Sequence, residues 1–569
     1  MARRIRWQIF IAVLSSLLVL GLMSYLALTT VVSSQPLVGG DYVEGLVGAP
    51  QQVNPLLGDS ARDPGGADLR ALLFDGLMRI GPDGSPEPAL AQTRPMMNDS
   101  GTVYTFTLRS DVRWHDGMPL TADDVVFTLR AVGGRGYTGD PVAGALWRSV
   151  LVEKVDDFTV RCVLNAPFAP FLSYATFPIL PAHLLGDLSP EQWPLVPFNR
   201  QPVGTGPYQL VEWTDSRVLL RANPNYYDGR PFIEQIEFRI FNDAPSALAA
   251  LTRGDIMGLG FLGTGELGRS NLPRTVARHQ LPLDSYTVLT FNLREGPLAD
   301  LEVRRALARA LDKQSIVNNT LAGQVVKLDT PILLGWEGAE EQALWYLYDP
   351  ERAGNDLTAL GWELGSDGVR VKNGVRLEFT LITDTSPDRI LAAEAVASQW
   401  RSIGVAVTVE SLDGVQLSER LTERDFTMAL HGWQRLGSDP DVYSLWHSSQ
   451  ADVGDNYAGL EDTEIDELLS AARTDLDPIM RNENYSAFQH RWIELAPSIT
   501  LYQPLFVYAT STKLEGLGFN TTQSDPMAEE HGDTVDVASN YLLIGRESRF
   551  RNVRQWSVLS TREIRGVLQ

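Results

Sequence analysis

Alternating hydrophobic positions and helix-start signals mark a compact α/β unit early in the chain. The apolar residues Tyr104, Phe106 and Leu108 alternate with polar ones, and this period of two predicts a half-buried strand. Thr121, with Asp124 three residues later and an apolar run after it, predicts a helix that begins with a capping box. The stretch therefore predicts a strand, a tight turn and a capped helix in direct succession.

The second half of the chain alternates between strand and helix patterns. The predicted elements are a strand at 288–292, a helix at 300–311, a strand at 377–383, a helix at 389–403, a strand at 405–410 and a strand at 501–509. This alternation predicts an α/β lobe with partly parallel pairing. Because the chain enters this region near 282–290 and leaves it near 497–506, we expect a hinge with two crossings and a ligand cleft between two lobes.

The N-terminus carries a long uncharged segment. Three arginines among the first six residues precede a run from Ile9 to Val32, which is long enough to cross a bilayer once with the arginines on the cytoplasmic side. The run exceeds a usual secretory signal, so we favour an uncleaved signal anchor at residues 1–33. Cleavage after Val32-Ser33-Ser34 is the alternative. Both readings place the remaining chain outside the cytoplasmic membrane.

Composition disfavours some classes of function. The 569 residues carry a net charge of −23, whereas nucleic-acid binding needs clustered Lys and Arg, so we expect no nucleic-acid partner. A chain of this length can bury a large core and should form two or three domains. The single cysteine, Cys162, cannot form an internal disulfide, and we expect it to be a buried strand residue. No metal-ligand spacing is present, so we expect neither metal nor cofactor.

Several motifs resemble those of one protein family. The stretch 104–129, YTFTLRSDVRWHDGMPLTADDVVFTL, is similar to a signature of the extracytoplasmic solute-binding proteins of ABC importers, the oligopeptide/dipeptide/nickel-binding family. Asn54-Pro55-Leu56, the PVGTGPY segment at 202–208 and the helix that follows Asp349 resemble further family motifs. The resemblance implies an α/β, two-lobed periplasmic-binding-protein-like fold of class II type, with an extra inserted subdomain in the first lobe and a two-crossing hinge.

The resemblance also implies a division of the chain. We predict a first-lobe core from 34–65, 205–285 and 506–545, an inserted subdomain at 66–204, a second lobe at 286–505 and a C-terminal extension at 546–569. The extension lies outside the family pattern, and we expect a tail or an edge segment. Arg304 and Arg305 lie in a family motif on a predicted helix, and we expect them to be solvated or salt-bridged.

A catalytic constellation is not recognisable in the sequence. The seven histidines do not occur at His-Glu-x-x-His or a similar spacing, and Gly-x-Ser-x-Gly is absent. The paired carboxylates Asp123-Asp124 and Asp439-Pro440-Asp441 are of a kind that is more often structural than catalytic. We therefore predict a binding protein and not an enzyme.

The family resemblance implies that the loop after residue 430 faces the cleft. In the family a tryptophan of this loop lines the pocket, and Trp433 matches it. Peptide-binding members carry an aspartate three residues later that pairs with the peptide ammonium group, whereas this chain has Leu436, with Arg435 beside it. A buried ammonium without a counter-charge costs several kcal/mol, so Leu436 disfavours free-amine peptides.

The class of solute stays open at this point. A blocked peptide, an oligosaccharide or an anionic solute paired with Arg435 fits these residues. A peptide held by a different acid, with Arg435 in solvent, fits equally. We also predict ligand contacts from Asp439, Asn292, Tyr502 and Asn54.

The sequence thus predicts an anchored, monomeric receptor that binds a small solute between two lobes and delivers it to an ABC permease in the membrane. Closure around the solute requires contacts from both lobes, because only a difference in affinity shifts the equilibrium. One alternative is a membrane-anchored sensor or adaptor with the same fold. A less favoured alternative is an extracytoplasmic hydrolase.

Overall fold

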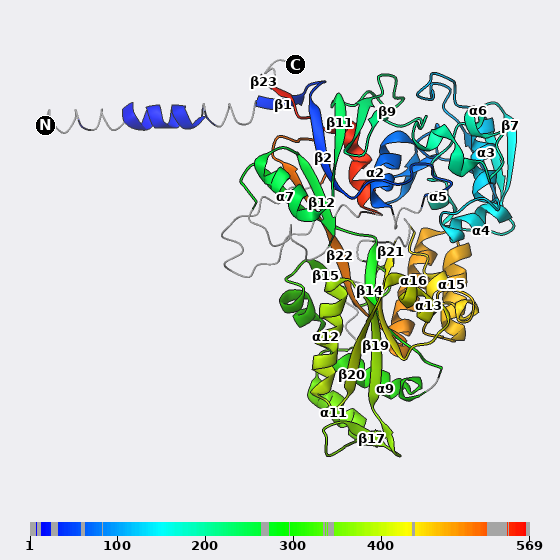
Figure 1. Ribbon diagram of the computed structural model, residues 1–569, viewed down its shortest axis with the longest axis vertical. Coiled ribbons are helices and arrows are strands. Elements are labelled where there is room, and N and C mark those ends of the chain that lie inside the picture. Colours follow the sequence, from blue (N-terminus) through cyan, green and yellow to red (C-terminus); the bar gives the residue numbers. More distant parts are fainter. Residues whose placement is uncertain are drawn as a thin grey trace.

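The computed structural model describes residues 7, 13–23, 25, 32–58, 63–81, 84–262, 272–294, 296–333, 336, 338–339, 346–434, 439–519, 543 and 545–564. Within these ranges the chain forms two lobes, lobe 1 at the top of Figure 1 and lobe 2 below it. Strand β22 (Ser498–Ser511) runs from one lobe into the other.

One twelve-stranded sheet extends through both lobes. Its main path is β20 (Ala406–Leu412), β19 (Glu378–Asp384), β21 (Met428–Gln434), β14 (Ser285–Phe291), β22, β12 (Gly258–Leu262), β2 (Asp41–Val47), β11 (Gln235–Phe241), β10 (Arg217–Ala222) and β9 (Tyr208–Trp213). Two further strands, β13 (Val276–Pro282) and β15 (Val325–Lys327), also pair with β22.

The hinge consists of two chain crossings that lie side by side. The first half of β22 pairs with β14 and β15 of lobe 2, and its second half pairs with β12 and β13 of lobe 1. The other crossing is at Leu283 and Asp284, between β13 and β14, where the Leu283 N–H donates to the Pro504 carbonyl at 3.1 Å. The predicted α/β fold with two lobes and a two-crossing hinge is confirmed.

A smaller sheet in lobe 1 contains the α/β unit that the sequence predicted. Its strands are β5 (Met96–Met97), β6 (Val103–Thr107), β8 (Thr159–Val163) and β7 (Leu151–Asp156), and α3 (Ala122–Val132) packs nearby. The predicted capping box is present, since Asp124 Oδ2 accepts from the Thr121 N–H at 2.8 Å. Cys162 is fully buried on β8, as predicted. The residue boundaries of the inserted subdomain and of both lobes remain predictions.

Lobe 2 carries helices on both faces of its sheet. They include α9 (Leu301–Arg309), α11 (Pro350–Ala359), α12 (Pro387–Arg401), α13 (Gly414–Thr422), α15 (Thr463–Thr474) and α16 (Pro478–Leu495). Aliphatic and aromatic side chains of α9 and α12 form a core with β14, β19 and β21. A separate core joins α15 and α16 to the opposite face of β14.

Arg304 differs from its prediction, whereas Arg305 agrees. Arg304 is buried and donates to the carbonyls of Leu495 and Ala496 at 2.7 and 3.0 Å. The last carbonyls of a helix have no partner within it, so Arg304 satisfies the end of α16. The prediction of a solvated or salt-bridged Arg304 is therefore wrong. Arg305 does pair with Glu302, at 2.7 Å.

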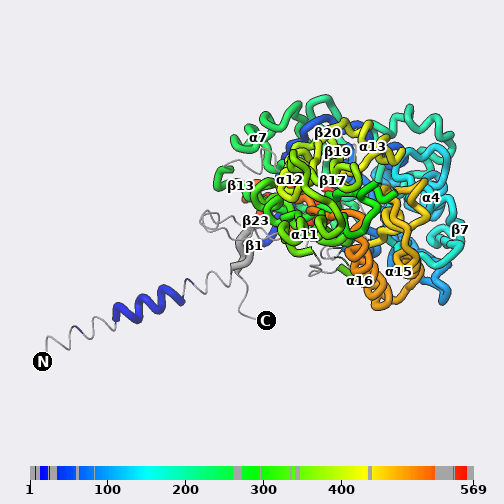
Figure 2. The backbone as a smooth tube through the Cα atoms, turned by 90° about the horizontal axis from the view of Figure 1, so that it is seen from below, coloured from blue at the N-terminus to red at the C-terminus, as the bar shows by residue number. Residues whose placement is uncertain are grey.

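The C-terminal extension is part of lobe 1. Its helical segment η6 (Arg546–Gln555) packs on α2 (Pro64–Leu73), and Arg549 is only 1% exposed. Strand β23 (Ser560–Ile564) pairs antiparallel with β1 (Val32–Pro36), and Figure 2 shows the two strands together at one side of lobe 1. The predicted edge segment is thus present, and it is joined to a packed segment.

The predicted N-terminal anchor lies partly outside the described residues. Residues 13–23 are helical and extend away from lobe 1 in Figure 1. No helix in the described part of the chain is both long and apolar enough to span a membrane.

Candidate functional site

The carboxyl ends of the parallel strands in both lobes point toward the hinge. β14 starts at the hinge, and β21 is antiparallel to it, so β21 and its parallel neighbour β19 end on the hinge side of lobe 2. In lobe 1, β12 is antiparallel to β22 and parallel to β2, so both end on the hinge side. Ligands of open α/β sheets bind at such strand ends, which places the candidate site between the lobes.

Three residues form a row across the hinge-side end of the lobe 2 sheet. Thr287 on β14 lies directly opposite Gly432 on β21 and Tyr502 on β22. A Cβ at Gly432 would lie 2.8 Å from Nη1 of Arg389, which begins α12. The missing side chain at Gly432 therefore lets the guanidinium lie against the strand, beside Thr287 and Tyr502.

Arg389 is oriented by Asp384, the last residue of β19. The Arg389 Nε donates to both Asp384 oxygens at 2.9 and 3.0 Å, and Nη2 donates to Oδ2. Burial opposes ionisation, yet the guanidinium holds the pKa of Asp384 below its usual range. Among the residues described, Nη1 has no hydrogen-bond partner. Arg389 therefore keeps one terminal nitrogen for an acceptor from outside.

Two buried hydroxyls lie next to this arginine. Thr287 and Tyr502 are 1% and 2% exposed; their hydroxyls interact with each other, and neither has a further hydrogen-bond partner in the described chain. Burial raises the pKa of Tyr502 to about 12, so its hydroxyl stays a donor at neutral pH. Because buried polar atoms in proteins are nearly always paired, these two hydroxyls mark a place where a polar ligand can bind.

Trp433 lies on the other face of the same strands. It pairs with Tyr286, one position along from the Gly432–Thr287 pair, so its side chain points away from Tyr502. The indole stacks on Tyr457, with ring centres 5.2 Å apart and planes 15° apart. It is half-buried beside the α15–α16 core. The structure therefore does not bring the predicted contacts Trp433 and Tyr502 onto one surface.

The other predicted contact residues have structural partners. Asn292 lies at the far end of β14 from the hinge, and its amide donates to the Arg424 and Phe426 carbonyls. Asn54 is fully buried, and its side chain accepts from the Leu56 N–H within a turn. These contacts account for the side chains without a ligand, and ligand contact by either residue remains a prediction.

The remaining predicted residues belong to the loop after β21. Asp439 is paired with Arg481 of α16, with both carboxylate oxygens at 2.8 Å from Nη2. Arg435 and Leu436 lie outside the described residues. Arg389, Thr287 and Gly432 were not predicted as site residues. A polar helix start directly after a parallel strand is the signal that could have identified Arg389.

The buried histidines His279 and His431 and the half-buried His115 are structural residues and do not belong to a metal-ligand cluster in the described chain. Burial lowers the pKa of His115 and His279 to about 4 and that of His431 to about 3, so all are neutral at pH 7. His431, for example, shares a hydrogen bond of 2.9 Å with Thr290. Across the described ranges no three His, Cys, Asp or Glu side chains come close enough to hold a metal ion.

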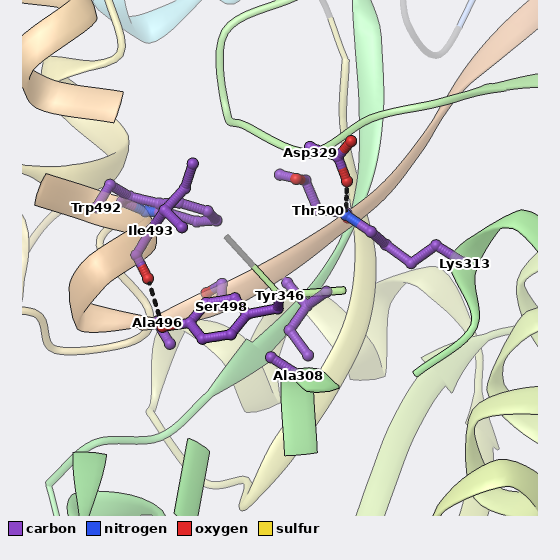
Figure 3. A pocket seen from close by; sticks show the side chains of 10 residues that line it. Ala308, Lys313, Asp329, Tyr346, Trp492, Ile493, Ala496, Ser498 and Thr500 are labelled. Atoms are coloured by element: carbon purple, nitrogen blue, oxygen red, sulfur yellow. Dashed lines mark hydrogen bonds and ion pairs between the residues drawn. The ribbon is translucent and has the colours of Figure 1, made fainter. Parts of the chain in front are cut away.

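A small cavity within lobe 2 is distinct from the strand-end site. It measures about 40 Å³ and lies where β22 begins, between Trp492, Tyr346 and the Lys313–Asp329 ion pair (Figure 3). Solute sites are usually about 300 Å³ or larger, whereas this space holds one or two water molecules. It is too small to be the solute site.

Comparison with known proteins identifies the family. The family model for bacterial extracellular solute-binding proteins, family 5 Middle, matches residues 85–455. The chain belongs to this family of extracytoplasmic solute-binding proteins, the binding components of ABC transporters.

Relatives match over most of the chain. The oligopeptide-binding protein AppA of Bacillus subtilis is 30% identical over 501 residues, which are 86% of this chain and 90% of that protein. Protein XP55 of Streptomyces lividans is 32% identical over 464 residues, 79% of this chain and 80% of that protein. The solved structure of B. subtilis AppA in complex with a nonapeptide has a TM-score of 0.70 at 27% identity, and the match covers 92% of this chain and 100% of that one.

Proposed function

We propose that this chain binds a peptide-like solute between its lobes and delivers it, unchanged, to an ABC permease. The observation that carries the proposal is the group of Arg389, Thr287 and Tyr502, which offers unpaired polar atoms at the strand ends facing lobe 1. The relative AppA is named for oligopeptide binding, and its solved structure holds a nonapeptide. These names support a peptide over the oligosaccharide alternative.

Each polar atom of this group has a suitable partner on a peptide. A terminal carboxylate would accept a charge-assisted hydrogen bond from Arg389 Nη1, and the hydroxyls of Thr287 and Tyr502 would bind backbone amides. Leu436 in place of an acid means that the peptide ammonium group has no counter-charge at that position. We therefore propose that the carboxyl end, and not the amino end, is the anchored end of the solute.

We further propose that the receptor is a monomer anchored by an uncleaved N-terminal helix. The uncharged run from Ile9 to Val32 supports an anchor. Cleavage after Ser34 would remove three of the β1 residues that pair with β23, among them Val32. Retention of these residues keeps the paired strands intact where the chain leaves lobe 1.

The test is to purify the full chain from membranes, unfold it mildly and identify the released solute by mass spectrometry. The proposal expects intact peptides with free carboxyl ends, and a much smaller amount from Arg389→Gln. Arg491→Gln, which removes a half-buried lobe 2 arginine paired with Asp462, is the matched control and should retain the peptides. Release of only sugars or metal complexes, or an Arg389→Gln yield equal to that of the control, would contradict the proposal.

A further inference from the structure

A contact between the two lobes lies at the end of α15, away from the hinge. The Ala169 N–H of lobe 1 donates to the Arg473 carbonyl of lobe 2 at 2.8 Å. The guanidinium carbon of Arg473 lies 5.5 Å from the centre of the Phe168 ring. A Cβ on Gly101 would lie 2.3 Å from Leu476 Cδ1, so the Gly101 backbone packs directly against Leu476. Figures 1 and 2 both show this part of lobe 1 beside α15.

The two sides of this contact belong to separate cores. Phe171, which follows Phe168 and Ala169, is buried in the same hydrophobic cluster as Tyr42 of β2 in lobe 1. α15 contributes Leu469 and Ala472 to a lobe 2 cluster that contains Trp492. Opening the lobes about the hinge must therefore separate Ala169 and Phe168 from Arg473.

The acceptor in this hydrogen bond lies at the end of a helix, where carbonyls need partners from outside. The last carbonyls of a helix have no intrahelical partner, and Arg473 is in the last turn of α15. Lobe 1 supplies the donor that this carbonyl lacks. An arginine over an aromatic ring adds a second attraction that depends on the same separation.

Arg473 also holds the segment that follows the predicted solute loop. Its Nε and Nη2 bond the Asp441 carboxylate at 2.8 Å, and its guanidinium carbon lies 4.1 Å from the centre of the Tyr443 ring. Asp439, two residues earlier, is held by Arg481. The same guanidinium thus contacts Asp441 and Tyr443 of lobe 2 and Phe168 of lobe 1.

We propose that Arg473 is a positioning residue that couples the segment around Asp441 and Tyr443 to closure of the lobes. When Asp441 is in place, the guanidinium lies where Phe168 and Ala169 of lobe 1 meet it, and the closed state is favoured. The proposal rests on the proposed function only in taking the closed state as the one that holds the solute; the contact itself is independent of any solute. Because apparent affinity scales with the fraction of closed protein, Arg473 also contributes to binding without touching the solute.

The test measures closure directly in the full chain without added solute. Spin labels are placed at Leu195→Cys of lobe 1 and Val453→Cys of lobe 2, which are 85% and 89% exposed, and their distance distribution is recorded by pulsed electron paramagnetic resonance. The native Cys162 is buried and does not compete for label. The variants are Arg473→Gln, Phe168→Ala and the double variant, with Arg491→Gln as the matched control on α16.

We expect Arg473→Gln and Phe168→Ala each to lower the closed-to-open ratio three- to ten-fold. The double variant should be no more open than the stronger single one, since both remove one contact. Arg491→Gln should match wild type. Phe168 is half-buried at the surface of lobe 1, so its truncation tests the contact even where Arg473→Gln perturbs lobe 2. Distributions that equal wild type in both single variants, or additive effects in the double variant, would overturn the proposal.

Discussion

Two arginine–carboxylate groups, one in each lobe, show how the same chemistry differs with its surroundings. In lobe 1, Arg549 is 1% exposed, and its two terminal nitrogens bond Asp68 and Glu44 at 2.7 and 2.9 Å. In lobe 2, the side chains of Arg389 and Asp384 are each 20% exposed, and Nη1 has no partner in the described chain. We call the lobe 1 group saturated because both of its terminal nitrogens are paired, although Nε of Arg549 has no partner in the described chain. The saturated group fixes a segment to a core, whereas the lobe 2 group, unsaturated at Nη1, lies at a strand end and can bind a ligand.

The largest effect is expected in the saturated group. Arg549→Met leaves Glu44 buried without a counter-charge and leaves Asp68 with Arg546 alone, so we expect the free energy of unfolding to fall by about 3–5 kcal/mol. Chemical denaturation of the purified protein measures this change. Arg554→Met is the control: Arg554 pairs with Asp228 at 3.0 Å but is 38% exposed, so its loss should cost less than about 1 kcal/mol. Equal losses of unfolding free energy in Arg549→Met and Arg554→Met would contradict the expected difference between the buried and the exposed ion pair.

Asp75 extends the comparison to a buried carboxyl that forms no ion pair with an arginine in the described chain. Burial raises the pKa of Asp75 to about 6, against opposing contributions from Arg79 and from the Tyr226 hydroxyl, 3.2 Å away. The folded state therefore binds more protons than the unfolded state, and stability is lost as pH rises from about 4 to 6. Asp75→Asn should be about 1–3 kcal/mol more stable than wild type at pH 7 and similar to it at pH 3.5. Denaturation at pH 3.5 and pH 7 measures the difference in stability between Asp75→Asn and wild type. The same difference at both pH values would contradict the prediction.

Substitution in the unsaturated group should weaken solute binding and leave the free energy of unfolding almost unchanged. Arg389→Gln removes a charge-assisted donor, so binding of an equimolar mixture of synthetic nonapeptides should weaken about 10- to 100-fold. Since Asp384 is partly solvated, the free energy of unfolding should change by less than about 1 kcal/mol. Calorimetric titration and denaturation measure the two quantities. A loss of stability comparable to that of Arg549→Met would make Arg389 a structural residue.

The smallest effect is expected from a single hydroxyl. Tyr502→Phe removes an oxygen that has no partner in the described chain beyond the Thr287 hydroxyl, so stability should stay within about 0.5 kcal/mol of wild type. If the hydroxyl binds the solute, affinity for the same nonapeptide mixture should fall about 3- to 10-fold. Thr287→Val tests the neighbouring hydroxyl in the same assay. Unchanged affinity in both variants would mean that, of these three residues, only Arg389 contributes to solute binding.

Local sequence patterns predicted the elements of this fold well. The capping box of Thr121 and Asp124 depends on residues three apart, and the alternation of Tyr104 and Phe106 depends on neighbours, so both were visible in the sequence. The two crossings were visible because strand patterns change near 282 and 500. Arg304 was misjudged because its partners, Leu495 and Ala496, are about 190 residues away.

The candidate site was harder to predict for the same reason. Tyr502, Thr287 and Gly432 meet only through strand register, and Arg389 reaches Gly432 only because β19 and β21 are parallel neighbours. The family motif pointed to Trp433, but side-chain alternation along β21 turns it to the other face. The C-terminal extension gave no local signal either, because Arg549 bonds Glu44 across 505 positions.

The pairing of β1 with β23 has a practical consequence for labelling this receptor. Val32 and Ile564 are directly opposite each other, so a fluorescent protein fused beyond residue 564 would start beside the N-terminal segment that we propose as the membrane anchor. If the proposed anchor is retained, such a fusion would crowd the membrane surface and compete for space with any docking permease. A reporter inserted at an exposed turn of lobe 2, such as the one at Asn373 and Gly374 between β17 (Arg370–Lys372) and β18 (Val375–Arg376), would avoid that crowding.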